Sequence, residues 1–322
     1  MTSTMHPLTI IQLRGSRKRR LAHTLRNMHM HAAKPKAVSP PPDNPIRVVC
    51  ISDTHNTRPV LPPGDVLIHA GDLAEKGSFD EVQAGLQWLS DQSQYRYKVL
   101  IAGNHDVLLD EAFLAKYPER RYGQTKTKDD LDWGSVIYLQ DTSVTLEFPS
   151  RSLTIFGSPW TPQYGISAFQ YPPGDGEGHW TGKFASLDSR AKPLVDIVVT
   201  HGPPKHHLDA RDLYRAGCPY LAEELARLKP RLHVFGHIHV SYGHEDVVLD
   251  GVQRAYEEVM TGWGGWTTVG WMAVLVLWGR LKWLFGKLGI AGKERAATTF
   301  VNASVVSGRK NELCNEPIVV EL

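Results

Sequence analysis

The segment RVVCISDTH, residues 47–55, joins a short apolar run to polar residues that follow it directly. Val48 to Ile51 have the length and the β-branched side chains of a buried strand, and Asp53 and His55 come next at alternate positions. Alternate residues of an extended chain point to the same side, so this spacing predicts that one carboxylate and one imidazole face the same cation. An apolar run followed by polar residues recurs four more times along the chain.

The recurrences are VLIHAGD (66–72), KVLIAGNHD (98–106), VDIVVTHGPP (195–204) and LHVFGHIH (232–239). In α/β sheets the carboxyl ends of the strands converge on one crevice, so polar residues at these ends are expected to surround one site. Oxygen and nitrogen donors without thiolates suit two Mn, Fe or Zn ions better than Mg or Ca. The polar residues at these ends are Asp72, Asn104, His105, Asp106, His201, His237 and His239.

Helical patterns and further strands separate these motifs. A helix is predicted over residues 79–92, where Ser78 and Glu81 have the spacing of a capping box, and another over 221–228. Two packed mixed β-sheets flanked by helices accommodate all of these elements, which predicts an α/β fold. The additional strands are predicted at 136–139, 144–148, 153–156, 247–249, 300–303 and 318–320.

Composition excludes several classes of protein. The chain has 322 residues, of which 42% are hydrophobic, so it is neither a disulfide-stapled miniprotein nor a disordered chain. A net charge of +2 gives no signal for nucleic-acid binding. The three cysteines lie far apart, which indicates a reducing, intracellular and cytoplasmic environment. The sequence does not indicate the number of subunits.

The first 45 residues differ in composition from the rest. There is no acidic residue from Met1 to Pro42, basic residues are frequent, and the stretch closes with SPPP at 39–42. We interpret residues 1–45 as a disordered basic extension with a Pro-rich linker. A mitochondrial transit peptide, or a basic arm for anionic surfaces, is the alternative.

A second unusual segment, residues 251–297, interrupts the later motifs. Val259 to Gly279 lack charge, and five of the nine tryptophans lie here. Helical spacing predicts an amphipathic helix within 259–290 that lies in a membrane interface, with a soluble lid or an oligomer contact as alternatives. A single crossing is disfavoured because the chain after the insertion must rejoin the folded body that carries the earlier motifs. The predicted apolar stripe is Trp271, Val274, Leu275, Trp278, Leu281, Phe285 and Leu288, opposite Gly279, Arg280, Lys282, Gly286 and Lys287.

The ordered set SDTH, AGD, AGNHD, THGPP and FGHIH resembles the motifs of the calcineurin-like metallophosphoesterases, over residues 46–322. VNAS at 301–304 and PIVV at 317–320 resemble the MPPED (239AB) branch, which is related to class III cyclic-nucleotide phosphodiesterases. The resemblance implies an αββα sandwich formed by residues 46–250 and 298–322. The insertion at 251–297 departs from the compact pattern of the family.

The resemblance also implies roles for individual residues. Asp72 would bridge two divalent metal ions, His105 takes the position of the catalytic histidine, and Asp106 that of its supporting acid. One ion would be held by Asp53, His55, Asp72 and His239, and the other by Asp72, Asn104, His201 and His237.

The expected activity is hydrolysis of a small-molecule phosphoester by a metal-activated hydroxide. We expect a phosphodiester, with His105 protonating the leaving oxygen. A phosphomonoesterase is one alternative. Another is a membrane-associated scaffold that retains the metal site for stability.

Overall fold

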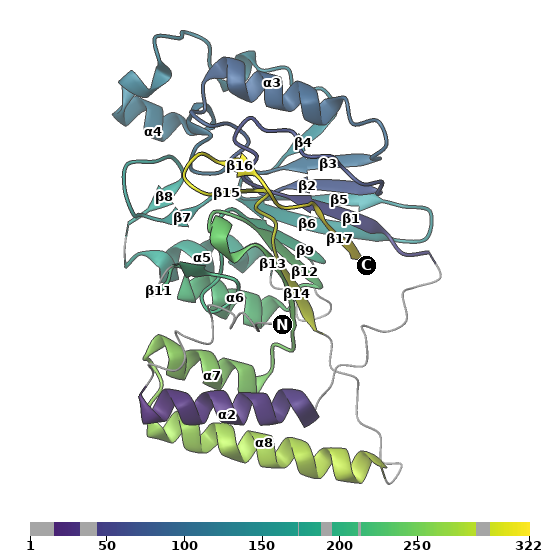
Figure 1. Cartoon of the computed structure of the whole chain (residues 1–322), viewed down its shortest axis with the longest axis vertical. Helices are drawn as coiled ribbons and strands as arrows, with labels where there is room; N and C mark the ends of the chain where they lie inside the picture. Colours follow the sequence, from purple (N-terminus) through teal and green to yellow (C-terminus); the bar gives the residue numbers. More distant parts are fainter. Residues whose placement is uncertain (1–15, 33–43, 173, 188–194, 212–213, 288–296) are drawn as a thin grey trace, which may run out of the picture.

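The computed structural model describes residues 16–32, 44–172, 174–187, 195–211, 214–287 and 297–322. Two β-sheets pack face to face, helices cover their outer faces, and a further layer of three helices lies at one end of the molecule (Figure 1). This arrangement confirms the predicted α/β fold with two mixed sheets.

The first sheet has five strands in the order β17-β1-β2-β3-β4. Strands β1 to β4 are parallel, and β17 pairs antiparallel with β1 at the edge. The bounds are β1 Arg47–Ile51, β2 Val66–His69, β3 Tyr97–Leu100, β4 Val136–Tyr138 and β17 Ile318–Glu321.

The second sheet has six strands in the order β13-β14-β12-β9-β6-β5. The four inner strands are parallel, and the two outer strands run antiparallel to their neighbours. An isolated parallel bridge from Ser52 to Ser304 connects the carboxyl ends of β1 and β14, so the two sheets meet at this edge. The bounds are β5 Thr142–Glu147, β6 Ser152–Ser158, β9 Ile197–Thr200, β12 Leu232–Phe235, β13 Gly243–Val247 and β14 Thr298–Asn302.

The core between the sheets explains the apolar runs. Cys50 and Ile68 of the first sheet share one buried cluster with Ile197 and Val234 of the second. Both faces of each sheet are covered, so the strands are apolar on both sides. The outer helices are α3 Phe79–Ser90 and α4 Glu111–Lys116 on the first sheet, and α5 Gly176–Phe184 and α6 Pro219–Leu228 on the second.

Short elements connect these layers. They are the strands β7 Thr161–Pro162, β8 Gln170–Tyr171, β10 Ala210–Arg211, β11 Tyr214–Arg215, β15 Val306–Ser307 and β16 Glu312–Leu313, and the 3-10 turns η1 Val107–Leu109, η2 Pro118–Arg121, η3 Lys128–Asp130, η4 Ala185–Leu187 and η5 His239–Ser241.

The predicted capping box is present, whereas one strand lies a few residues before its predicted position. The capping box before α3 is present: the Ser78 hydroxyl accepts from the Glu81 amide, and the Glu81 carboxylate accepts from the Ser78 amide. The strand predicted at 247–249 instead ends at Val247 and begins at Gly243. Its polar residues pair with β14 at an edge of the sheet, where one face needs no apolar side chains.

The interpretation of residues 1–45 as disordered is wrong for residues 17–32. These form helix α2 Arg17–Ala32, which packs against the helices of the insertion. Its contacts are distant in sequence: Ala22 joins a buried apolar cluster with residues of the insertion, Arg26 donates to Gln253, and His29 pairs with Asp250. Tertiary contacts therefore stabilise a helix whose own sequence lacks a clear apolar stripe. Residues 1–15 and the SPPP linker at 39–42 lie outside the described residues.

The insertion forms two helices, α7 Gly251–Thr261 and α8 Trp266–Lys287. With α2 they make one layer, which we call the helical layer, around Ala22, Tyr256, Val259 and Met272. Trp271, Val274, Trp278 and Leu281 of the predicted stripe are exposed, whereas Leu275 is half-buried against the layer. The side chains of residues 282–287, and residues 288–296 altogether, lie outside the described part. Within the described ranges, no helix is long and apolar enough to cross a bilayer.

Candidate metal centre

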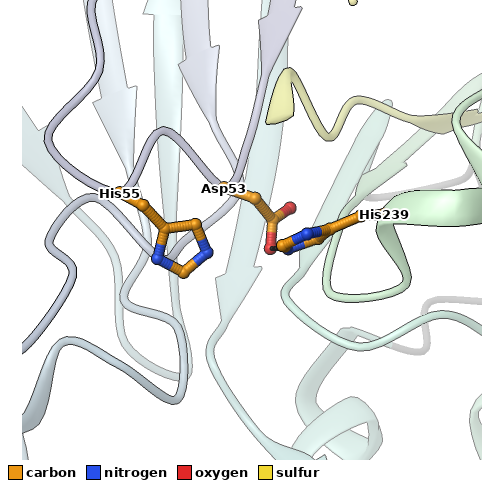
Figure 2. Close-up of side chains that lie close together, drawn as sticks. All are labelled: Asp53, His55 and His239. Atoms are coloured by element: carbon orange, nitrogen blue, oxygen red, sulfur yellow. Dashed lines mark hydrogen bonds and ion pairs between the residues drawn. The ribbon is translucent and has the colours of Figure 1, made fainter. Parts of the chain in front are cut away.

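Three side chains from two loops form the first donor group. Figure 2 shows Asp53 and His55 in the loop after β1, and His239 reaching the Asp53 carboxylate from η5, with 3.2 Å between Nε2 and Oδ1. The ring centroids of His55 and His239 are 5.4 Å apart. One donor atom of each residue lies within 4.8 Å of the others. This spacing suits a single metal ion.

The second donor group comes from the loops after β2, β3, β9 and β12. One donor atom from each of Asp72, His201 and His237 lies within 4.8 Å of the others. Asn104 adds an amide oxygen, Oδ1, at 3.0 Å from His201 Nε2. The imidazole rings of His201 and His237 are 5.0 Å apart and nearly perpendicular. These residues surround a second position for an ion.

The Asp72 carboxylate lies between the two groups. Its Oδ2 atom is 3.3 Å from His201 Nε2 and 3.8 Å from His55 Nε2. One carboxylate oxygen therefore faces a histidine of each group, as a bridging ligand must. All seven residues predicted as metal ligands are brought together by the fold.

The donor atoms fit divalent metal ions. His55 is buried, and neither ring nitrogen makes a hydrogen bond with a described residue; Nδ1 lies 3.3 Å from the Glu75 carboxylate without hydrogen-bond geometry. A buried imidazole without a partner is costly unless another ligand satisfies it. The Nδ1 atom of His201 faces the Ala70 carbonyl at 2.9 Å, an arrangement that leaves Nε2 for a metal.

The buried carboxylates stay ionised. Burial by itself raises the pKa of Asp53, but the hydrogen bond and charge of His239 and the charge of His201 lower it by more. The net shift of this pKa is downward. The pKa of Asp72 is likewise held well below its usual range, against the effect of burial, by His201 and His105. Two buried negative charges attract cations.

Glycines allow the loops to approach these carboxylates. A Cβ atom on Gly103 would lie 2.2 Å from Asp72 Oδ1, and one on Gly236 would lie 2.0 Å from Asp53 Oδ2. Any larger residue would displace a donor. Steric crowding therefore explains why glycine occupies these positions of AGNHD and FGHIH.

His105 lies beside the first donor group, and among the described residues no hydrogen bond links it to Asp106. The His105 ring lies 4.8 Å from that of His55, and its Nδ1 atom is 2.7 Å from the Glu75 carbonyl. The Asp106 carboxylate instead accepts backbone N–H groups of Leu73, Ala74 and Gly103. Asp106 therefore stabilises the loops after β2 and β3, and the carbonyl of residue 75 orients the imidazole.

Three neighbours of the site escaped the sequence analysis in these roles. Ser304 donates to Asp53 Oδ2 at 2.8 Å, and the VNAS segment at the end of β14 is the signal that points to it. Glu75 contacts both His55 and His105. Tyr164 lies with its ring 5.1 Å from that of His237, and no motif marks it.

Two mixed sheets with two donor groups at their strand ends form a candidate site for two metal ions. Residues 46–241 match the calcineurin-like phosphoesterase family, and the chain belongs to this family. The predicted resemblance to the MPPED branch is also confirmed, since relatives carry the name Metallophosphoesterase domain-containing protein 1.

Two relatives and one solved structure illustrate the similarity. The chain is 41% identical to the probable rhamnogalacturonate lyase C of Emericella nidulans over 283 residues, covering 87% of this chain and 25% of that protein. It is 39% identical to human Metallophosphoesterase domain-containing protein 1 over 231 residues, 66% of this chain and 65% of that protein. The chain thus spans only part of either relative. The phosphopantetheinyl hydrolase of Mycobacterium tuberculosis is 18% identical, with 62% of this chain and 84% of that chain covered and a TM-score of 0.40.

Proposed function

We propose that this chain hydrolyses a phosphodiester with the help of two divalent ions, Mn, Fe or Zn. The observation that carries the proposal is the position of Asp72, which faces a histidine from each of two donor groups. A structural metal site needs one closed shell, whereas two adjacent groups that share a carboxylate are typical of two-metal hydrolysis.

Each ion would have its own donors. Asp53, His55 and His239 would hold one, and the residues around His201 would hold the other, with Asp72 common to both. When bound, such ions activate water and neutralise the charge on phosphoryl oxygens. The protein supplies fixed ligands, because Ser304 and the His237 amide both donate to the Asp53 carboxylate.

His105 would act as the proton donor. Its Nδ1 atom faces the Glu75 carbonyl at 2.7 Å, which leaves Nε2 as the atom that passes a proton to the leaving oxygen. Burial lowers the pKa of His105, but the charge of Asp72 and the carbonyl of Glu75 raise it more, and the net shift is upward. A raised pKa keeps the imidazole protonated before transfer.

A diester is favoured over a monoester by the surface beside the second group. Tyr164 and Ile166 are exposed, and the Tyr164 ring packs against His237. A diester carries two organic groups, and the Tyr164 ring would provide apolar contact for the second one. A monoester has only its leaving group, so it has no second organic group to make this contact.

Purified protein reconstituted with Mn, Fe or Zn tests the proposal, with bis-p-nitrophenyl phosphate compared against p-nitrophenyl phosphate. We expect two ions per chain and a larger kcat/KM for the diester. His105→Asn should lower kcat by roughly 100-fold to 10,000-fold while metal content stays at two. A larger kcat/KM for the monoester would favour a phosphomonoesterase. Full metal content without turnover of either ester would favour the scaffold.

A further inference from the structure

The outward face of α8 is apolar and open to solvent. Trp266 and Leu277 are 60% exposed, Trp271 is 59% exposed, and Val274 and Leu281 are each about half exposed. Their spacing places them on one side of the helix, and we call these five residues the apolar face. A group of large side chains exposed to this extent marks an interaction surface.

The apolar face is not needed for the folding of the helical layer. Val269, Met272 and Val276 on the opposite side of α8 are buried against α2 and α7. Figure 1 shows α8 furthest from the two sheets, running along the edge of the molecule. Among the described residues, the core of the layer is therefore complete without the apolar face.

Positive charge accompanies this face. Neither α2 nor α8 contains an acidic residue. Arg17, Arg19 and Arg20 are exposed in the first turn of α2, and Lys18 donates to the Gly264 carbonyl, which fixes this basic turn beside the start of α8. Arg280 is exposed further along α8. A partner of this surface must therefore offer apolar contact to the aromatic and aliphatic side chains and negative charge to the arginines.

We propose that the apolar face docks onto the surface of an anionic lipid bilayer. A helix of 22 residues that lies flat would place Trp and Leu among the acyl chains, and the neighbouring arginines would meet the lipid phosphates and carboxylates. A second copy of this chain would bring two acid-free helix pairs together, with no carboxylate on either to neutralise the arginines. The charge pattern thus favours anionic lipid over self-association.

Sedimentation of the full chain with phosphatidylcholine vesicles, with and without phosphatidylserine, tests this docking. We expect binding to the mixed vesicles that weakens as salt is raised, because screening reduces the attraction of the arginines. The double variant Trp271→Gln/Leu277→Gln should reduce partitioning at least about tenfold. The triple variant Arg17→Gln/Arg19→Gln/Arg20→Gln should reduce it roughly 100-fold on phosphatidylserine vesicles and little on phosphatidylcholine.

A matched control is Val60→Gln/Leu313→Gln, which removes two exposed apolar side chains outside the helical layer and should bind like the parent chain. Thermal unfolding of each variant checks that the layer remains folded. The docking is wrong if the parent chain fails to sediment with phosphatidylserine vesicles, or if both test variants bind as the control does. A dimer in analytical ultracentrifugation that the double variant dissolves, without vesicle binding, would assign the face to a second copy.

Discussion

His207 connects the phosphoesterase sheets to the helical layer, and its replacement should have a defined effect on stability. The side chain is buried, with Nδ1 3.0 Å from Glu245 of β13 and Nε2 3.0 Å from Glu257 of α7. Its ring stacks on Phe300 at a centroid distance of 4.1 Å. Both nitrogens face carboxylates, so both must carry a proton, and the side chain is an imidazolium.

The magnitude follows from the pKa of this group. Burial lowers the pKa of His207, but the hydrogen bonds and charges of the two carboxylates outweigh burial and raise it from 6.5 to about 9. At about 1.4 kcal/mol per pH unit, the charged contacts contribute about 3 kcal/mol. A raised pKa in the folded state means that this contribution is complete below pH 6.5 and is lost as the pH rises to about 9.

His207→Gln keeps a polar side chain and removes the charge. Urea unfolding at a series of pH values should show the parent chain about 3 kcal/mol more stable than the variant below pH 6.5, with the difference shrinking towards pH 9. His244→Gln changes an exposed histidine of β13 and should alter stability by less than about 0.5 kcal/mol. A His207→Gln difference that does not change between these pH values would refute the assignment of an imidazolium.

Three further predictions concern the site and a helix start. Asp72→Asn removes the shared charge, so metal content by mass spectrometry should fall below two ions and activity should drop at least about 100-fold. Gly236→Ala places a Cβ 2.0 Å from Asp53 Oδ2 and should lower metal affinity with a stability cost of about 1–3 kcal/mol. Gly178→Ala, in open space within α5, should leave metal affinity unchanged and should not lower stability. Ser78→Ala removes the cap of α3 and should lower the free energy of unfolding by about 1 kcal/mol in urea titrations. An unchanged free energy of unfolding would show that the Ser78 hydroxyl does not stabilise this helix.

The sequence predicted most of the fold because its signals are local. Each parallel strand is an apolar run closed by polar residues, and the capping box before Phe79 is read within four positions. The seven donor residues follow from the same runs, since strand ends determine where they lie. The edge strand β13 was predicted at a displaced position because its polar residues His244, Glu245 and Asp246 show no alternation with apolar residues.

Elements that depend on distant contacts could not be predicted in this way. Helix α2 contacts Gln253, Asp250 and the Gly264 carbonyl, all of which lie more than 200 positions further along the chain. The carboxylate of Asp106 could be assigned only once its three backbone donors were seen. Both cases involve hydrogen bonds between segments, and such pairs leave no periodic trace in a single sequence.

The loop after β1 brings Asp53 and His55 together through a backbone geometry other than the predicted one. The D-x-H spacing predicted convergence from an extended chain, but Asp53 and His55 have φ of 54° and 43°, in the left-handed region. The loop after β2 holds them there: Asp53 N–H donates to the Gly71 carbonyl, and His55 N–H donates to the Asp72 carbonyl. Left-handed backbone at non-glycine residues is unfavourable, so these hydrogen bonds preorganise the donors at the expense of stability. The two loops therefore act as one unit, and a change in the second should disturb the ligands of the first.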